Sequence, residues 1–149
     1  SLIMLIQMLA NTGINIVPLL EMLGNTITVI PDTVTQMYQY SDNNNPDNKL
    51  KGIVYAPNLE TVELRSIDDN SGMTTIIMPK VKTIKSQGFW ASYGLKTVFI
   101  PNSCTSLATN AFSMCGNLTN IYIDNVEGTF GDIAADSSLP NLKVTYLRK

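Results

Sequence analysis

The sequence predicts a β-rich solenoid of about five turns, each about 22–24 residues long, with parallel strands and an N-terminal helical cap. Three observations lead to this fold class. A leucine-type position recurs at nearly constant spacing, a short apolar alternation follows it each time, and residues 1–24 show helical patterning instead. The chain of 149 residues has the length of a single domain, which we divide into a cap over residues 1–24 and a solenoid over residues 25–149.

The leucine-type position recurs about once every 22–24 residues, at Leu50, Met73, Leu95, Leu118 and Leu142. After it come two apolar residues with one residue between them, which is the pattern of a short strand with one buried side. A unit of this length cannot bury that side alone, but it can when it stacks on its neighbours. The expected inward pairs are Ile53/Tyr55, Ile76/Met78, Val98/Ile100, Ile121/Ile123 and Val144/Tyr146.

Other apolar positions of the repeat are expected to fill the rest of the coil. Proline ends three of the strands, where its missing N–H removes no ladder hydrogen bond. Phe89 and Phe112 each precede the next leucine-type position by the same interval, and Ile67 takes that place one turn earlier. A second apolar pair follows each proline, and these pairs are Val34/Met37, Leu59/Val62, Val81/Ile84 and Cys104/Leu107.

The N-terminal segment is expected to cap the solenoid, whose first turn would otherwise expose apolar core. Helices are predicted over Leu2–Ala10 and Pro18–Leu23, and Gly24 ends the second. The stretch "GINIVP" between them is alternatively a degenerate strand, because it repeats the apolar and proline spacing of the later strands. The opening apolar run is far shorter than the roughly 20 residues that cross a bilayer, so we expect no membrane span.

The repeat motif resembles that of a known family. Its pattern is Leu-x-x-Ile/Val-x-Ile-Pro, then Val/Cys-x-x-Leu/Ile, then Ala/Gly-Phe-x-x-Cys/Ser-x-x-Leu, with the clearest copies at Met73–Leu95 and Leu95–Leu118. These residues resemble the BspA-type leucine-rich repeat of bacterial surface proteins, over about residues 25–147. The turn that begins at Leu50 departs from the pattern, with one extra residue before its proline, and residues 41–49 and 124–141 are irregular.

The resemblance implies a leucine-rich-repeat-like solenoid that works as a non-enzymatic protein-interaction module. It also implies a bacterial cell-surface or secreted adhesin-like protein, and hence an extracellular or cell-surface location. The implied partner is a protein of a host or of a neighbouring cell, or a second copy of the chain, and a glycan is a further candidate ligand. The alternative role is a structural part of a larger assembly, such as a phage tail or a multidomain surface protein.

The residue between each inward pair is predicted to point outward and to form an apolar column of Val29, Val54, Ile77, Phe99, Tyr122 and Thr145. A second outward column contains Gly52, Thr75, Thr97, Asn120 and Lys143. Exposed apolar stripes of this extent mark interaction surfaces. We therefore predict a binding or self-association surface of Val54, Ile77, Phe99, Tyr122, Thr75, Thr97 and Asn120.

An apolar outward column is equally compatible with three alternatives. β-Branched and aromatic residues suit strands anywhere. The N-terminal segment could instead fold over the column, or further parts of a longer protein could cover it.

A second candidate surface is the aromatic loop that follows Phe89, where Trp90 and Tyr93 stand close together. Tyr38 and Tyr40 occupy the equivalent region of an earlier turn. Exposed aromatic side chains stack on sugar rings or anchor protein partners. The alternative is that they pack on the convex side of the coil.

Two further groups of residues have side chains that are common in functional sites, but we expect structural roles for both. Cys104 and Cys115 lie on different sides of one turn, so we expect free thiols packed in the core and no disulfide. Residues 41–49 and 66–72 are rich in oxygen ligands, yet neither matches the spacing of an EF-hand calcium loop. We expect both to be surface turns, and we predict no metal and no cofactor.

Composition argues against catalysis and against nucleic-acid binding. Histidine is absent, which removes Ser-His-Asp and Cys-His chemistry together with most zinc sites. The available carboxylates fall in turns and share no sheet face, and they are Asp68, Asp69, Asp124, Glu127, Asp132 and Asp136. The net charge is −2 and the cations form no cluster, so the phosphate neutralisation that nucleic acids need is not provided.

Overall fold

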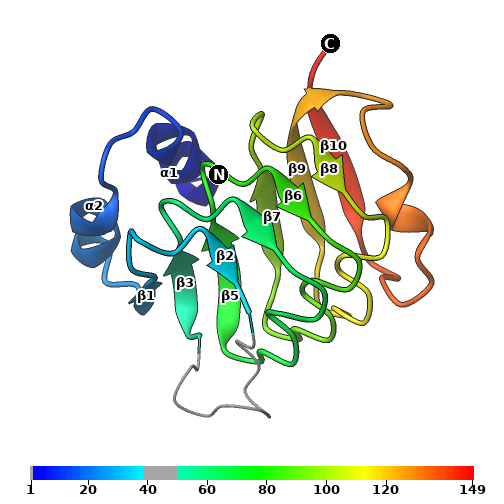
Figure 1. Ribbon diagram of the computed structural model, residues 1–149, viewed down its shortest axis with the longest axis horizontal. Helices are drawn as coiled ribbons and strands as arrows, with labels where there is room; N and C mark the ends of the chain where they lie inside the picture. Colours follow the sequence, from blue (N-terminus) through cyan, green and yellow to red (C-terminus); the bar gives the residue numbers. More distant parts are fainter. Residues whose placement is uncertain (1, 39–49) are drawn as a thin grey trace.

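Most turns of the coil carry two strands that belong to different sheets, as the computed structural model in Figure 1 shows, whereas a 3-10 helix follows β9 in place of the second strand. The structure describes residues 2–38 and 50–149. One side of the coil holds the longer strands, and the opposite side holds a four-stranded sheet in the order β2-β4-β6-β8. Every strand pairing among the described residues is parallel, which confirms the predicted parallel solenoid of about five turns. The longer strands are β1 (Ile27–Val29), β3 (Gly52–Tyr55), β5 (Met73–Ile77), β7 (Thr97–Ile100), β9 (Asn120–Val126) and β10 (Lys143–Arg148).

The four-stranded sheet is built from two-residue strands that stack one repeat apart. Thr61 pairs with Thr83, and Thr83 pairs with Ser106, so the register follows the sequence period directly. The outward residues of these strands are polar while their partners point into the coil. The strands are β2 (Gln36–Met37), β4 (Thr61–Val62), β6 (Thr83–Ile84) and β8 (Ser106–Leu107).

The core of the solenoid consists of the predicted repeat positions. Phe89 and Phe112 are fully buried, and their rings stack with centroids 5.0 Å apart and planes 4° from parallel. The inward pairs of β5, β7 and β9 and the apolar residues that follow each proline join the same cluster, as predicted. Val144 and Tyr146 of the last strand are only partly buried, and β10 pairs with β9 alone among the described residues.

Strand β3 corrects the prediction for its turn. Val54 points into the coil with 0 % of its surface exposed, whereas Ile53 and Tyr55 point outward and belong to a different apolar cluster. The extra residue in this turn is accommodated at the start of the strand, where Gly52 has a φ of +64° and the pairing with β5 shifts register between Gly52 and Ile53. Gly52 is therefore not part of the outward column, and Ile53 takes its place opposite Thr75.

Two helices precede the coil, α1 (Leu2–Ala10) and α2 (Val17–Met22). The first has the predicted bounds and the second begins and ends one residue earlier than predicted, followed by Gly24 with a φ of +71°. The stretch between them forms no strand, so the alternative for "GINIVP" is wrong. A short 3-10 helix, η2 (Ile133–Ala135), occupies the irregular segment after β9. Among the described residues, no helix is both long enough and apolar enough to cross a membrane.

The side of the coil that holds the longer strands is divided into two three-stranded sheets. One has the order β1-β3-β5 and the other β10-β9-β7, so the ladder is interrupted between β5 and β7. At this point the Lys96 N–H donates to the Thr74 carbonyl at 3.0 Å, and Thr75 Oγ1 donates to the Thr97 carbonyl at 2.5 Å. A side-chain hydrogen bond therefore replaces part of the backbone ladder.

Candidate interaction surface

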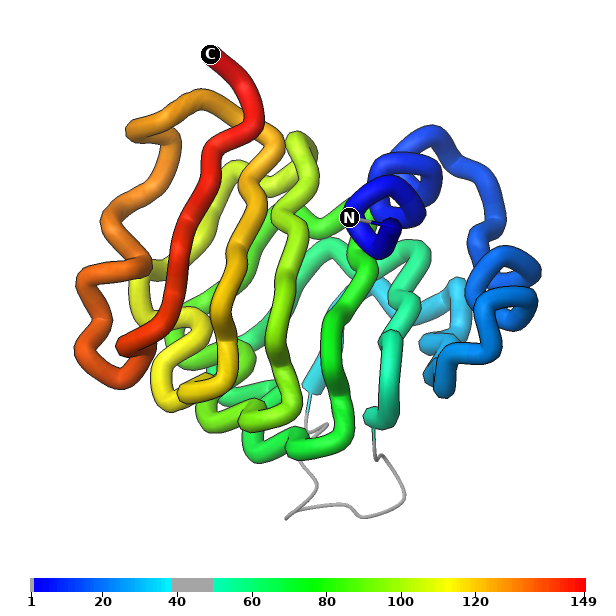
Figure 2. Tube along the Cα trace, turned by 180° about the vertical axis from the view of Figure 1, so that it is seen from behind, coloured from blue at the N-terminus to red at the C-terminus, as the bar shows by residue number. Residues whose placement is uncertain are grey.

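The outward side of the longer strands is covered in its N-terminal half by the two helices. Ile6 and Ala10 of α1 and Leu20 of α2 share an apolar cluster with outward residues of β3 and β5. Figure 2 shows α1 lying across the N-terminal strands, while no helix lies in front of β7, β9 and β10. The cap therefore does more than close the end of the coil, because it shields the sheet face of two strands. The shielded outward residues are Ile53, Tyr55 and Ile77.

The predicted apolar stripe is consequently not an exposed one. Ile77 is 1 % exposed because the helices cover it, and Phe99 is 2 % exposed. Val54 lies inside the coil, and Tyr55 replaces it in the outward column, where burial raises the pKa of its hydroxyl. Folding of the N-terminal segment over the column, one of the three alternatives, thus accounts for the burial of Tyr55 and Ile77. Val29, at the N-terminal end, remains 46 % exposed.

The accessible part of the outward side belongs to β7, β9 and β10, and we call it the C-terminal outer face. Its pairings place Thr97 beside Asn120, Asn120 beside Lys143, and Tyr122 beside Thr145. Tyr122 is half-buried, as is Asn120 on the same side of β9. The face combines one aromatic ring with hydroxyl, amide and ammonium groups, and it consists of Thr97, Asn120, Tyr122, Lys143 and Thr145.

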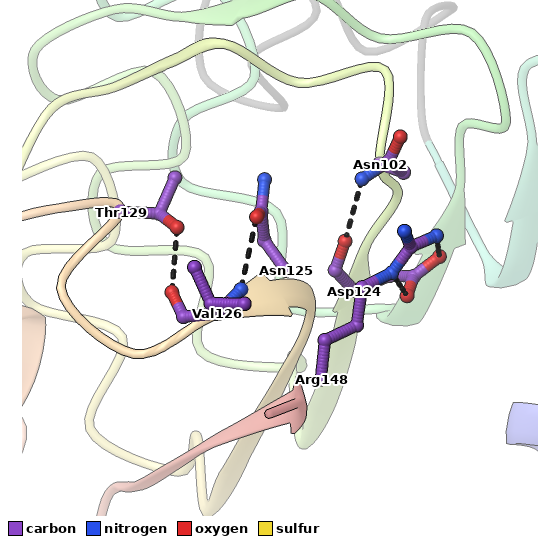
Figure 3. A network of polar contacts seen from close by, with 6 residues as sticks. All are labelled: Asn102, Asp124, Asn125, Val126, Thr129 and Arg148. Atoms are coloured by element: carbon purple, nitrogen blue, oxygen red, sulfur yellow. Dashed lines mark hydrogen bonds and ion pairs between the residues drawn. The ribbon is translucent and has the colours of Figure 1, made fainter.

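The rim of this face carries an ion pair that fixes the last strand. Arg148 Nε lies 2.8 Å from Asp124 Oδ1, and the Asp124 carbonyl accepts a hydrogen bond from Asn102 Nδ2 at 3.1 Å (Figure 3). Beside it, the Asn125 side chain accepts from the Val126 N–H, and Thr129 Oγ1 donates to the Val126 carbonyl. Both charges at this rim are thus neutralised within the chain, whereas Lys143 has no ion pair among the described residues.

The aromatic loop is only partly available. The guanidinium carbon of Arg65 lies 3.9 Å from the centroid of the Trp90 ring, so a cation covers one side of the indole. Arg65 is itself held by Asp68, with Nε and Oδ2 3.0 Å apart. Tyr93 is 48 % exposed, and its backbone carbonyl accepts a hydrogen bond from Asn117 in the next turn. Tyr38 is exposed as well, while Tyr40 lies outside the described residues.

The oxygen-rich segment 66–72 forms part of the coil rather than an open loop. Ser66, Asp68 and Asn70 are buried, and Asp68 is engaged with Arg65. In the part of the chain that the structure describes, no group of three or more Cys, Asp or Glu residues is close enough to hold a metal ion. The other oxygen-rich segment, residues 41–49, lies outside the described residues.

Both cysteines are free, buried and part of the solenoid core, which confirms the prediction of packed thiols. Burial raises the pKa of Cys104 to about 11 and that of Cys115 to about 12. The Cys115 thiol donates to the Phe89 carbonyl at 3.0 Å. Neither sulfur is a nucleophile at neutral pH, because a protonated and shielded thiol does not react.

Comparison with known proteins agrees with the geometry of the coil. No curated protein and no solved structure is significantly similar to the chain. A family model described as "BspA type Leucine rich repeat region (6 copies)" matches residues 44–145, which is more than half of the chain. The chain therefore belongs to the BspA-type leucine-rich repeat family, and this membership indicates a protein-interaction repeat module.

Proposed function

We propose that this chain is the interaction module of a bacterial cell-surface or secreted adhesin-like protein, and that it binds a protein partner through the C-terminal outer face. Membership of the repeat family supports a protein-interaction role. The surface context rests on the resemblance of the motif to repeats of bacterial surface proteins. No step of this proposal requires catalysis.

The observation that carries the proposal is the uneven cover of the outward side. The helices pack on β3 and β5 and leave Tyr122 and its neighbours accessible. Tyrosine is enriched at binding hot spots because its ring buries apolar area while its hydroxyl finds a hydrogen-bond partner. Asn120 and Thr97 add donors and acceptors that fix the orientation of a bound chain.

A structural role in a larger assembly is the second candidate function, and one observation favours it. Strand β10 pairs only with β9, so one edge of the sheet is unpaired among the described residues. Its inward residues Val144 and Tyr146 stay half-buried at this end of the coil. An added strand from another subunit would complete both the ladder and the core there.

The test is a binding screen against purified extracellular-matrix proteins, namely fibronectin, laminin and collagen, and against a glycan panel, measured by surface plasmon resonance. Tyr122→Ala and Asn120→Ala are expected to weaken any hit at least tenfold. Thr83→Ala on the four-stranded sheet is the matched control, because it is a half-buried strand residue on the opposite side of the coil. Phe99 is left intact because it is buried.

Light scattering after size exclusion separates the two candidate functions. A monomer whose hits depend on Tyr122 supports the interaction module. A dimer that becomes a folded monomer on Val144→Pro in β10 supports the assembly role. The Lys143 N–H donates to the Thr119 carbonyl next to β9, so the following N–H, that of Val144, faces the free edge, and proline removes this donor. Hits that survive both Tyr122→Ala and Asn120→Ala would refute the assignment of the C-terminal outer face.

A further inference from the structure

A groove opens between α1 and the sheet, next to the C-terminal outer face but distinct from it. It has a volume of about 340 Å³. Ile3 and Ile6 of α1, Leu23 after α2 and Ile53 of β3 form its apolar walls. Lys96 and Thr97, at the start of β7, line its other side. The groove therefore joins the cap to both halves of the divided sheet.

The interruption of the ladder between β5 and β7 explains where the groove lies. The two strands belong to different sheets, and they are joined here by the Lys96 N–H to the Thr74 carbonyl and by the side chain of Thr75. Helix α1 crosses the outward face on the N-terminal side of this division, and Ile53 and Ile77 belong to the apolar cluster that the two helices form with the sheet. The helix thus covers one sheet, and the groove follows its border with the other.

The charge of the groove is one-sided. Lys96 is its only ionisable lining residue, and no carboxylate among the described residues lines it. Lys96 forms no ion pair with any acidic residue in the part of the chain that the structure describes. Thr74, Thr75 and Thr97 line the groove together with Lys96, while the residues of the helices and Ile53 that line it are mostly aliphatic. Such a site is complementary to a molecule that has an aliphatic tail and an anionic head.

We propose that the groove binds a short-chain aliphatic carboxylate, with its hydrocarbon tail between α1 and Ile53 and its carboxylate at Lys96. The volume is at the lower end of the roughly 300–1,000 Å³ that is typical of small-molecule sites, so a chain of about eight carbons suits it better than a long one. This role is independent of the protein-binding role proposed above, because the C-terminal outer face shares only Thr97 with the groove.

The test uses the full chain and sodium octanoate, followed by the backbone amide signals in two-dimensional ¹⁵N NMR. Octanoate is expected to shift the amides of Thr75, Lys96 and Thr97. Each CH₂ group added between butanoate and octanoate should tighten binding about two- to fourfold, because it buries more aliphatic surface. Octan-1-ol should bind about threefold more weakly than octanoate, since an exposed ion pair contributes little more than this.

Three variants decide between the groove and unspecific binding. Lys96→Gln should abolish the preference for octanoate over octan-1-ol. Lys80→Gln is the matched control: it makes the same charge change outside the groove, on a side chain that is hydrogen-bonded to Asn58, and it should leave the preference intact. Ile3→Glu places a carboxylate in the wall of the groove and should prevent octanoate binding while the far-ultraviolet circular dichroism spectrum remains that of the wild type.

Several outcomes would overturn the proposal. These are the absence of octanoate binding, an equal affinity for octan-1-ol, unchanged discrimination in Lys96→Gln, and unchanged binding in Ile3→Glu. Amide shifts confined to Asn120, Tyr122 and Thr145 would assign the ligand to the C-terminal outer face instead, and would also overturn it. None of these results bears on whether Tyr122 mediates protein binding, so the two proposals fail separately.

Discussion

At the scale of single residues, the coil imposes backbone conformations that the residue types do not favour. Several non-glycine residues have positive φ, and they recur at equivalent corners of successive turns. Arg65 and Gln87 are one repeat period apart, and so are Asp69, Ala91 and Met114 in succession. A left-handed conformation costs a side-chain-bearing residue about 1 kcal/mol or more, so stacking must offset this cost at each corner.

Glycine is required at position 94 for a different reason, the close approach of two turns. A Cβ at Gly94 would collide with the carbonyl oxygens of Ser71 and Met73, which are backbone atoms and cannot rotate away. Gly94→Ala should lower the free energy of unfolding by about 1–3 kcal/mol, measured by urea denaturation. Gly116→Ala is the control, because a Cβ added there would meet no atom within 4 Å. Equal losses in both variants would contradict this explanation.

The two thiols provide a second test at this scale. Burial raises the pKa of Cys104 to about 11 and that of Cys115 to about 12, so at pH 8 both are protonated as well as shielded. Ellman's reagent should therefore label almost no thiol in the native protein and both thiols in guanidinium chloride. Rapid labelling of the native protein at pH 8 would show that this part of the core is open to solvent.

At the scale of elements, the segment after β9 is tied to the coil by one carboxylate. Asp136 accepts hydrogen bonds from Ser113 Oγ at 2.5 Å, from the Ser138 N–H at 2.9 Å and from Ser138 Oγ at 2.7 Å. Burial by itself would raise the pKa of Asp136, but these three bonds outweigh it, and the pKa falls below its ordinary value of 3.8. The charged form is therefore favoured in the folded state.

The sign of this shift predicts a pH dependence. A carboxyl group whose pKa is lower when folded stabilises the protein above its unfolded pKa, and this contribution is lost as the pH falls through the folded value. Urea unfolding should thus show wild type more stable than Asp136→Asn at pH 7, with the difference shrinking below about pH 4. A difference that stays constant from pH 7 to pH 3 would exclude the ionised carboxylate as its cause.

At the scale of the whole molecule, the solenoid and its cap have separate cores. The repeat positions form one apolar cluster, while α1 and α2 form a second one with the outward residues of β3 and β5. The coil can therefore keep its stacked strands when the cap is disturbed. What the cap protects is the apolar face of Ile53, Tyr55 and Ile77.

Ile6→Asp should detach α1, because it buries a charge against this face. We expect increased binding of the dye ANS, self-association in light scattering, and an unchanged β-sheet signal in circular dichroism. Leu5→Asp is the matched control, since Leu5 is the neighbouring residue and is 54 % exposed. Loss of the β-sheet signal in Ile6→Asp would mean that the two clusters fold as one unit.

Much of the fold could be predicted from the sequence, because a solenoid contact is a contact between residues one period apart. Phe89 and Phe112 are one period apart and stack, and the pairing of Val98 with Ile121 has the same separation. The candidate surface was harder to predict. Tyr122, Thr97 and Asn120 lie on the accessible part of the outward side, whereas Thr75, Ile77 and Phe99 are buried and Val54 faces the core.

The sequence by itself determined the period, the inward positions of the regular turns and the bounds of α1, since each depends on local pattern. The tertiary structure decided three further features. The first is the side of β3 that faces the core, which changes where Gly52 accommodates an extra residue. The second is the part of the sheet that α1 covers, and the third is the groove at Lys96. The physical reason is that contacts between the cap and the sheet join unlike segments, which leave no periodic trace in the chain.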